Sequence, residues 1–294
     1  MKSSTQEITL VIITYNSSNQ IGKLLKSIDN TINSKLLSKI IIIENNSPDK
    51  ERTQDLIRKY QSKNNLKIKF VLSKKNNGFA KSCNFGAKLA NSKYVLFLNP
   101  DTELTRKSLQ TILSHAKNSK ADFIGGKSVT HDGKIHKTVV RYPGLMTGLF
   151  EFTNLGKIFR ISAGHRYFYY NDLDIYNSHT DIEVEALGGV YILAKLDSFN
   201  LISGFDERFF MYLEDVDLGF RANDAGLKVI FCPHSIIEHI GGASSTNKHH
   251  IRHQAWYDSR RIYFKKHFGI IVNCIIQPIF IIEEFALKVR EKYS

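Results

Sequence analysis

Short apolar runs rich in β-branched residues recur along the first hundred positions of the chain. They occupy residues 8–14, 39–44, 66–72 and 94–98, and each is roughly five to seven residues long. Such runs are typical of strands buried on both faces, as in a parallel sheet. Helical periodicity lies between and after these runs, at residues 21–31, 53–64, 80–90 and 105–119. The alternation predicts an open α/β sheet joined by right-handed crossovers.

The regular alternation stops between residues 130 and 181, where the chain becomes aromatic and basic. A long irregular stretch inside a compact domain is usually a functional loop or lid, although a structural packing arm has the same pattern. The remaining elements that we expect are a strand at 184–194, a helix at 214–225 that Gly226 ends, a strand at 228–232 that Pro233 stops, and a basic, aromatic helix at 246–268.

The most apolar tract of the chain is residues 268–287. Asn273, Gln277 and Pro278 interrupt it and two glutamates lie near its end, so the pattern does not favour a helix that spans a membrane. Together with the basic residues that precede it, the tract predicts an interfacial anchor on an anionic membrane. The alternative is a C-terminal helix buried in the core.

Composition narrows the class of protein. The chain has 294 residues, of which 42% are hydrophobic, so it can form one large domain or two smaller ones with a sizeable core. The net charge of +13 suits nucleic acid, an anionic membrane or a phosphate-bearing substrate, and equally a solvated basic surface. Its three cysteines lie far apart, which excludes a readable disulfide framework or zinc ribbon. With no apolar leader-like stretch at the start, we expect a cytoplasmic location.

Polar residues follow each of the first four predicted strands. These clusters are Thr14-Tyr15-Asn16, Glu44-Asn45-Asn46-Ser47, Asn76-Asn77-Gly78 and Asn99-Pro100-Asp101-Thr102. In an open α/β sheet, ligands bind beyond the carboxyl ends of the strands. A carboxylate there, such as Asp101, can hold a divalent metal that also binds phosphate oxygens. Gly78 opens a helix and leaves backbone N–H groups accessible to phosphate, although the spacing is not that of a dinucleotide site or a P-loop.

Residues 204–239 form an acidic and aromatic segment in an otherwise basic chain. Carboxylates beside aromatic surface are expected where a proton is moved or a cation is held. Asp215 lies in the first turn of a predicted helix, where the helix dipole favours the ionised form of a general base. The neighbouring acids Glu214 and Asp217 point to other faces of that helix. His239 ends the segment and is a candidate metal ligand with Asp101.

Taken together, these motifs resemble those of family 2 glycosyltransferases, and among them the bacterial rhamnosyltransferase-like group. The matching stretches are VIITYN (11–16), IENNSPD (43–49), NNGFAKSCNFG (76–86), FLNPDT (97–102), LGGVYIL (187–193), GFDERFFMYLEDVDLGFR (204–221) and HIGGAS (239–244). They occur in the order found in the family and cover roughly residues 8–245.

The resemblance implies a GT-A fold, in which a mostly parallel central sheet is flanked by helices and followed by a C-terminal helical extension. It implies one domain over residues 1–245, with a donor half to about 127 and an acceptor half from about 128, and an extension over 246–294. It further implies an inverting transfer of a sugar from a nucleoside diphosphate to an acceptor hydroxyl. The first expectation for the donor is dTDP-rhamnose, followed by UDP-linked hexoses.

The resemblance also assigns roles to residues. The donor-binding set is Thr14, Tyr15, Asn16, Glu44, Asn46, Asn77, Gly78, Asn84 and Asn99, with Glu44 standing where the family usually has Asp. Asp101 and His239 are the implied ligands of Mn²⁺ or Mg²⁺, and Asn99 replaces the first acid of the D-x-D-type motif. Asp215 is the implied catalytic base. The acceptor-binding set is Gly189, Phe205, Asp206 and Glu214.

The implied acceptor is a glycan or a polyprenyl-linked glycan of cell-surface polysaccharide synthesis, reached at the inner face of the cell membrane. Two other classes of function remain open from the residues. A nucleotidyltransferase would need a glycine-rich, arginine-bearing loop after the first strand, where Tyr15 and Asn16 stand. A non-catalytic protein that binds nucleic acid or an anionic surface would need no carboxylate cluster, and its affinity would fall steeply with salt. We therefore expect no nucleic-acid partner.

Overall fold

The computed structural model describes residues 6–29, 35–63, 67–159, 168–170, 174–239 and 249–293. The strands are β1 (Ile8–Thr14), β2 (Leu37–Glu44), β3 (Ile68–Leu72), β4 (Tyr94–Leu98), β5 (Thr102–Leu104), β6 (Phe123–Val129), β7 (Ile135–His136), β8 (Val139–Val140), β9 (Ile182–Glu183), β10 (Ala186–Leu187), β11 (Tyr191–Lys195) and β12 (Val229–His239). The helices are α1 (Ser18–Asp29), α2 (Lys50–Lys63), α3 (Phe79–Lys88), α4 (Ser108–Ser119), α5 (Leu155–Ile158), α6 (Leu196–Leu201), α7 (Glu214–Asp224), α8 (His249–His267) and α9 (Ile270–Tyr293), with a π-helical turn η2 (Thr147–Glu151) and a 3₁₀ turn η3 (Ile175–Asn177).

Ten of the described strands form one sheet, in the order β3-β2-β1-β4-β11-β6-β12-β5, with β7 beside β6 and β9 beside β12. The run of strands β3-β2-β1-β4 is parallel throughout, and β6 and β12 are parallel to each other. Strand β11 enters antiparallel between β4 and β6, and β5 pairs antiparallel with β12 at the edge. The sheet confirms the predicted α/β class, and β11 joins the parallel first half to the second half.

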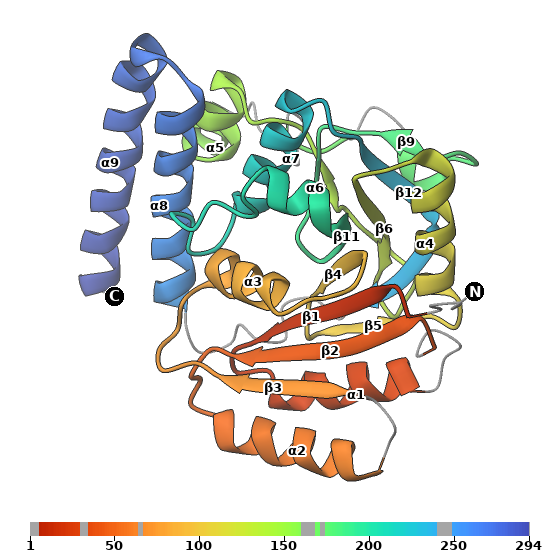
Figure 1. Ribbon diagram of the computed structural model, residues 1–294. Helices are drawn as coiled ribbons and strands as arrows, with labels where there is room; N and C mark the ends of the chain where they lie inside the picture. Colours follow the sequence, from red (N-terminus) through yellow and green to blue (C-terminus); the bar gives the residue numbers. More distant parts are fainter. Residues whose placement is uncertain are drawn as a thin grey trace.

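Helices cover both faces of this sheet, as Figure 1 shows. Alternate residues of β1 point to opposite faces, so Leu10 and Ile12 pack with α1, α2 and α4, whereas Val11 and Ile13 pack with α3, α6 and α7. Two buried cores result, one on each side of the sheet. The polar clusters that were predicted after β1, β2 and β4 lie at the carboxyl ends of these parallel strands, where α/β sheets bind ligands.

Two predicted strands differ from the structure. The stretch 184–194 is divided into β10, which pairs with β8 in a separate two-stranded sheet, and β11 of the main sheet, with a turn at residues 188–190 between them. The last strand does not stop at Pro233: β12 continues to His239. Its register with β6 shifts between Cys232 and Ile236. A bulge there places the proline off the ladder, so its missing N–H removes no pairing hydrogen bond.

The C-terminal extension consists of α8 and α9, which lie side by side at one edge of the molecule (Figure 1). A third cluster of buried residues, among them Phe152, Leu213, Phe264 and Phe280, joins this pair to η2 and α7. Helix α9 runs without interruption through Pro278. In the structure the C-terminal helix is not buried in the core, because only 22% of Ile270–Leu287 is buried. By length and composition alone, this stretch could cross a membrane.

The irregular stretch predicted at 130–181 folds partly into β7, β8, η2, α5 and η3. Its residues 160–167 and 171–173 lie outside the described residues, as does the HIGGAS motif after His239 and the predicted start of the helix at 246. The described part packs against α8 and β10 and contributes to the cleft described next.

Candidate active site

A cleft of about 680 Å³ opens between the start of α7, the turn at 188–190, the β7–β8 segment and α8. One wall is aromatic, with Phe152, Phe168, Tyr169 and Trp256. The lining also brings together polar groups from distant parts of the chain, among them Asn99, His136, Gly189 and Asp215. A concave, largely apolar site with a few converging polar groups is typical of small-molecule binding.

Asp215 lies in the first turn of α7, where it was predicted. The two residues before the helix, Tyr212 and Leu213, have left-handed φ angles of 73° and 62°, which turn the chain into the helix. The carboxylate accepts a hydrogen bond from the Gly189 N–H at 2.7 Å and one from the Val216 N–H at 2.8 Å. Burial raises the pKa of Asp215 above its ordinary value, against these backbone hydrogen bonds. The structure therefore holds one oriented carboxylate of increased basicity in the cleft.

Glu214 precedes it and lines the same cleft, but it is only 4% exposed. Its Oε2 atom has no hydrogen-bond partner among the described residues. Burial, and then the charge of Asp215, raise the pKa of Glu214 well above its ordinary value. Asp215, which receives two backbone hydrogen bonds, is therefore the one of the two neighbouring carboxyl groups that ionises more readily.

Asp101 and His239 meet because β5 pairs with β12. The register sets His239 opposite Thr102, and the imidazole Nε2 lies 3.2 Å from Asp101 Oδ1. The two side chains are 12% and 7% exposed. Adjacent oxygen and nitrogen ligands of an octahedral cation lie about 3 Å apart. The donor types and their spacing therefore fit a Mn²⁺ or Mg²⁺ ion.

His136 is a residue that the sequence analysis missed. Its Nδ1 lies 3.3 Å from Nδ1 of His239, and its ring also lines the cleft. Burial lowers the pKa of His136, with a further contribution from His239, so its imidazole is neutral and available as a donor or ligand. Nothing in the sequence pattern marked it, because it lies in the irregular stretch and is the second residue of a strand of only two residues.

Thr14 and Glu44 lie buried at the ends of β1 and β2. They are register partners, and the Thr14 hydroxyl donates to Glu44 Oε2 at 2.7 Å. The other oxygen, Oε1, accepts from the Ser47 hydroxyl at 2.6 Å and from its N–H at 2.9 Å. Both Thr14 and Glu44 are fully buried. The longer acid at position 44 is thus used to hold the 45–47 loop, and Asp49, which bonds to the Ser47 hydroxyl at 2.6 Å, extends this network.

The other predicted donor-side residues of this region lie in the loops that follow β1, β2 and β3. Tyr15, Asn16, Asn46 and Asn77 are half-buried, and the backbone of Asn16 and Asn46 is left-handed at φ 54° and 56°. Gly78 has φ 78°, and a Cβ there would lie 2.3 Å from the Phe210 carbonyl oxygen. The next N–H, of Phe79, donates to that same carbonyl at 2.7 Å. Glycine is therefore required where the donor-side loop meets the 204–213 segment.

In the described part of the chain, the predicted site residues that line the cleft are Asn99, Gly189, Glu214 and Asp215, whereas Asn84, Phe205 and Asp206 are engaged within the protein. Asn84 is buried and bonds to both the N–H and the carbonyl of Phe205, at 2.9 and 2.8 Å. Phe205 is 1% exposed and packs against Phe97 in the core. Asp206 pairs with Arg208 at 2.6 Å and with Lys266 of α8 at 2.7 Å. These contacts hold the 204–213 segment in place, and direct binding by the three residues stays a prediction.

Residues 9–188 match the family model described as Glycosyl transferase family 2. The chain is 28% identical over 147 residues to the N-acetylglucosaminyl-diphospho-decaprenol L-rhamnosyltransferase of Mycobacterium tuberculosis strain H37Rv, a match that covers 50% of this chain and 46% of that protein. It is 26% identical over 181 residues to the rhamnosyltransferase WbbL of Escherichia coli K12, which covers 60% of this chain and 58% of WbbL. The chain thus spans about half the length of these curated relatives.

Among solved structures, GalNAc-T7 with UDP, GalNAc and Mn²⁺ superposes with a TM-score of 0.61 at 14% identity, over 81% of this chain and 44% of that one. At this identity the likeness shows the fold alone, and it is the GT-A fold expected from the sequence.

Proposed function

Because the chain belongs to glycosyl transferase family 2, and is therefore a glycosyltransferase, we propose that it moves a sugar with inversion from a nucleoside diphosphate to an acceptor hydroxyl. The observation that carries this proposal is the cleft that Asn99, beside the Asp101–His239 pair, shares with the oriented carboxylate of Asp215. A donor whose diphosphate lies near Asp101 would present its sugar to a hydroxyl held at Asp215.

Asp215 acts as the general base in this reaction. The Gly189 and Val216 N–H groups fix one oxygen each, which orients the carboxylate and leaves further lone pairs for the acceptor hydroxyl. The proton passes to Asp215 as the hydroxyl oxygen attacks the anomeric carbon, on the side opposite the departing diphosphate. Burial raises the pKa of Glu214 beside it well above its ordinary value, so Glu214 ionises less readily than Asp215.

Asp101 and His239, with His136 next to them, would hold the divalent cation that the family implies. When bound there, a cation supplies positive charge to the diphosphate and improves it as a leaving group. The backbone turn that carries Asp101 is held by a hydrogen bond of 2.7 Å from the Thr102 hydroxyl to the Asn99 carbonyl. This hydrogen bond within the chain fixes the turn, and with it the position of the Asp101 carboxylate.

For the donor we propose dTDP-rhamnose first, since two similar curated proteins are named as rhamnosyltransferases. A UDP-linked hexose is the second candidate, because a structural relative is solved with UDP. For the acceptor we propose a polyprenyl-linked glycan, since one relative's name describes a diphospho-decaprenol compound. The aromatic wall formed by Phe152, Phe168 and Trp256 suits stacking against a sugar ring. This reaction belongs to cell-surface polysaccharide synthesis, at the inner face of the membrane.

The proposal is tested with purified protein, Mn²⁺ and a panel of dTDP-, UDP- and GDP-sugars, by following release of nucleoside diphosphate with and without a polyprenyl-diphosphate-linked acceptor. We expect turnover with dTDP-rhamnose that needs the cation and is abolished by chelator. Turnover only with UDP-hexoses would select the second donor. No release with any sugar, together with tight salt-sensitive binding to nucleic acid, would replace the enzyme proposal by the binding one.

A further inference from the structure

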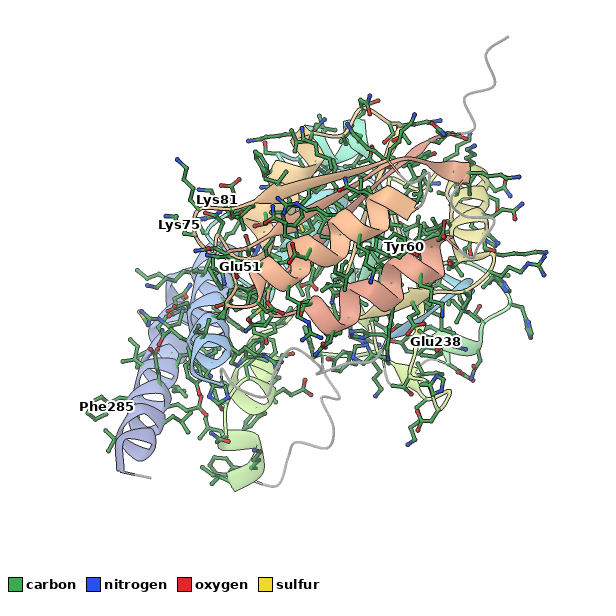
Figure 2. The ribbon with its side chains drawn as sticks, turned by 90° about the horizontal axis from the view of Figure 1, so that it is seen from below. Glu51, Tyr60, Lys75, Lys81, Glu238 and Phe285 are labelled. Atoms are coloured by element: carbon green, nitrogen blue, oxygen red, sulfur yellow. The ribbon has the colours of Figure 1, made fainter. Side chains whose placement is uncertain are left out.

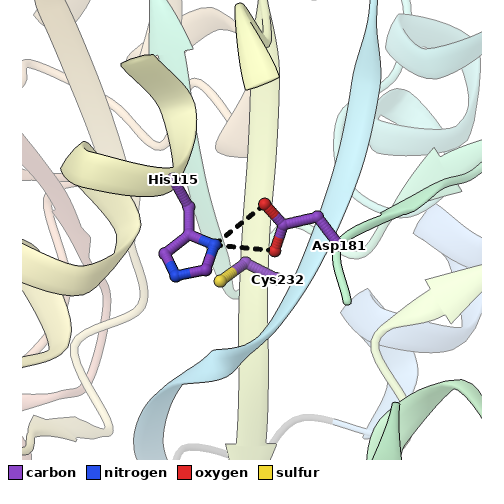
Figure 3. Close-up of side chains that lie close together, drawn as sticks. All are labelled: His115, Asp181 and Cys232. Carbon is purple, nitrogen blue, oxygen red and sulfur yellow. Dashed lines mark hydrogen bonds and ion pairs between the residues drawn. The ribbon is translucent and has the colours of Figure 1, made fainter. Parts of the chain in front are cut away.

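A second group of ligand-type side chains lies on the α4 face of the sheet. His115 comes from α4, Asp181 from the segment just before β9, and Cys232 from the middle of β12 (Figure 3). Their donor atoms all lie within 4.8 Å of one another. None of the three is among the residues that line the cleft, so this cluster is separate from the proposed active site.

Two side chains of the cluster are partly exposed and the third is buried. His115 Nδ1 lies 2.9 and 2.8 Å from the two oxygens of Asp181. These two side chains are 30% and 19% exposed, whereas Cys232 is fully buried behind them. The sulfur thus lies in the protein interior, within 4.8 Å of donor atoms of a partly exposed imidazole and a partly exposed carboxylate.

The donor set is one nitrogen, one oxygen and one sulfur. Zn²⁺ accepts all three types at bond lengths of 2.0 to about 2.3 Å, and its tetrahedral ligands lie roughly 3.3–3.8 Å apart. The three donor atoms lie within 4.8 Å of one another, and the His115–Asp181 contact of 2.8–2.9 Å has to open by up to about 1 Å to reach the tetrahedral spacing. A hard cation such as Mg²⁺ would not favour the sulfur.

We propose that His115, Asp181 and Cys232 form a second, zinc-type metal site, with water in the fourth position. The nearby ring of His234, centred 5.5 Å from that of His115, is engaged with the His179 carbonyl at 3.0 Å and stays outside the set. The site links α4, the segment before β9 and β12. Since β12 carries His239 seven residues further along, the ion stabilises the strand that presents a ligand to the first site.

The competing account is a plain ion pair between His115 and Asp181 above a buried thiol. In that case burial, and then the charge of Asp181, simply keep Cys232 protonated, with its pKa raised to about 12. A bound metal would displace the thiol proton, so binding should release protons and weaken as the pH falls. The two accounts differ in whether sulfur contacts the ion, which can be measured directly.

The experiment uses Co²⁺ as the probe, on full-length protein freed of metal by chelator. To silence the first site, it is run on the Asp101→Ala/His239→Ala variant as well as on the wild type. We expect about one equivalent of Co²⁺ in the variant, with a thiolate-to-cobalt charge-transfer band that Zn²⁺ abolishes. The band is lost in Cys232→Ser and kept in Cys274→Ser, a matched change at the exposed cysteine. Absence of the band in otherwise wild-type protein, or its loss in Cys274→Ser, overturns the proposal.

Because Cys232 is buried, a serine there could disturb folding, so a second variant is needed. His115→Gln changes a partly exposed ligand, and we expect it to weaken Zn²⁺ binding by more than about tenfold. Zn²⁺ should also raise the Tm of the wild type by more than that of His115→Gln. Equal Zn²⁺ affinity in the two proteins would show that His115 does not coordinate the ion and that the ion-pair account is right.

Discussion

Asp215 and Glu214 are neighbours in the chain, yet they occupy different environments. Asp215 receives two backbone hydrogen bonds and opens on the cleft, whereas Glu214 is buried with one oxygen unpaired. A carboxylate that acts as a base contributes roughly 10²–10⁴ to the rate. We expect Asp215→Asn to reduce kcat by about that factor while the dissociation constant of the nucleotide changes little. Glu207→Gln, on the same segment but outside the cleft lining, is the matched control.

These two constants separate by single-turnover kinetics and calorimetry with the nucleoside diphosphate. Turnover of Asp215→Asn within a few-fold of the wild type would remove Asp215 from the role of base. A loss of the same size in Glu207→Gln would point to general disturbance of the segment.

The pH dependence follows from the raised pKa of Asp215. Transfer needs the ionised carboxylate, so the rate falls as the pH drops through its folded pKa. Since burial places that pKa above the ordinary value of 3.8, we expect the acidic limb of kcat to have its midpoint above pH 3.8. A pH profile with saturating substrates measures it. A limb at or below pH 3.8 would mean that the carboxylate is effectively solvated.

At the scale of elements, Asp217 joins α7 to α8. It is fully buried, and its oxygens contact Lys266 at 2.5 Å, His267 at 2.8 Å and Arg221 at 2.8 Å. Burial alone would raise its pKa, but the hydrogen bonds and charges of these partners hold it below the ordinary value. The stability this carboxylate confers is present above pH 3.8 and is lost as the pH falls through the lowered pKa.

We expect Asp217→Asn to lower the free energy of unfolding at neutral pH by about 3–5 kcal/mol, because it removes a fully buried counter-charge from Arg221 and leaves Lys266 with Asp206 alone. Urea unfolding measures this. Asp224→Asn, an exposed acid on the same helix, is the control and should change the stability by less than about 0.5 kcal/mol. Equal effects of the two substitutions would contradict the role given to Asp217.

The elements that the sequence predicted well are those with a local pattern. Strands β1 and β4 match their expected bounds because continuous apolar runs need no partner to be recognised. The continuation of β12 past Pro233 was missed because a bulge against β6 absorbs the proline, and that depends on tertiary pairing. The turn at 188–190 was missed because Gly189 there donates to Asp215, a pairing with a distant residue.

The same reasoning applies to the site residues. Asp101, His239 and Asp215 were predicted as site residues because they end recognisable strands or begin a helix within motifs. Asn84 and Asp206 are equally polar, but their partners lie 121 and 60 residues away in the chain, so their structural role could not be predicted. Specific long-range pairing decides such cases, and no pattern of one sequence contains it.

At the scale of the whole molecule, α9 presents an apolar stripe to solvent. The stripe consists of Ile271, Ile275, Ile282, Phe285 and Val289, whose spacing places them on one helical face. These side chains are between 39% and 76% exposed. Figure 2 shows Phe285 pointing away from the body of the molecule. With a net charge of +13, an anionic lipid surface is the partner we propose for the stripe.

We expect the protein to float with vesicles that contain anionic lipid, and less with neutral ones. Ile271→Ser/Phe285→Ser should reduce partitioning by at least about tenfold, because two large side chains lose their burial. Leu201→Ser, a residue 70% exposed on α6, is the control. If the double substitution leaves flotation unchanged while also converting a dimer into a monomer, the stripe is a contact between copies of the chain instead.

The pairing of β5 with β12 limits how enzymes of this kind could be recombined. Strand β5 follows β4 closely in the chain, yet it lies at the far edge of the sheet beside a strand formed more than a hundred residues later. A chimera that joins two parents at residue 127 would take β5 from one and β12 from the other. A crossover design must therefore take residues 102–104 and 229–239 from a single parent. Otherwise Asp101 and His239 come from two parents whose strands were not selected to pair with each other.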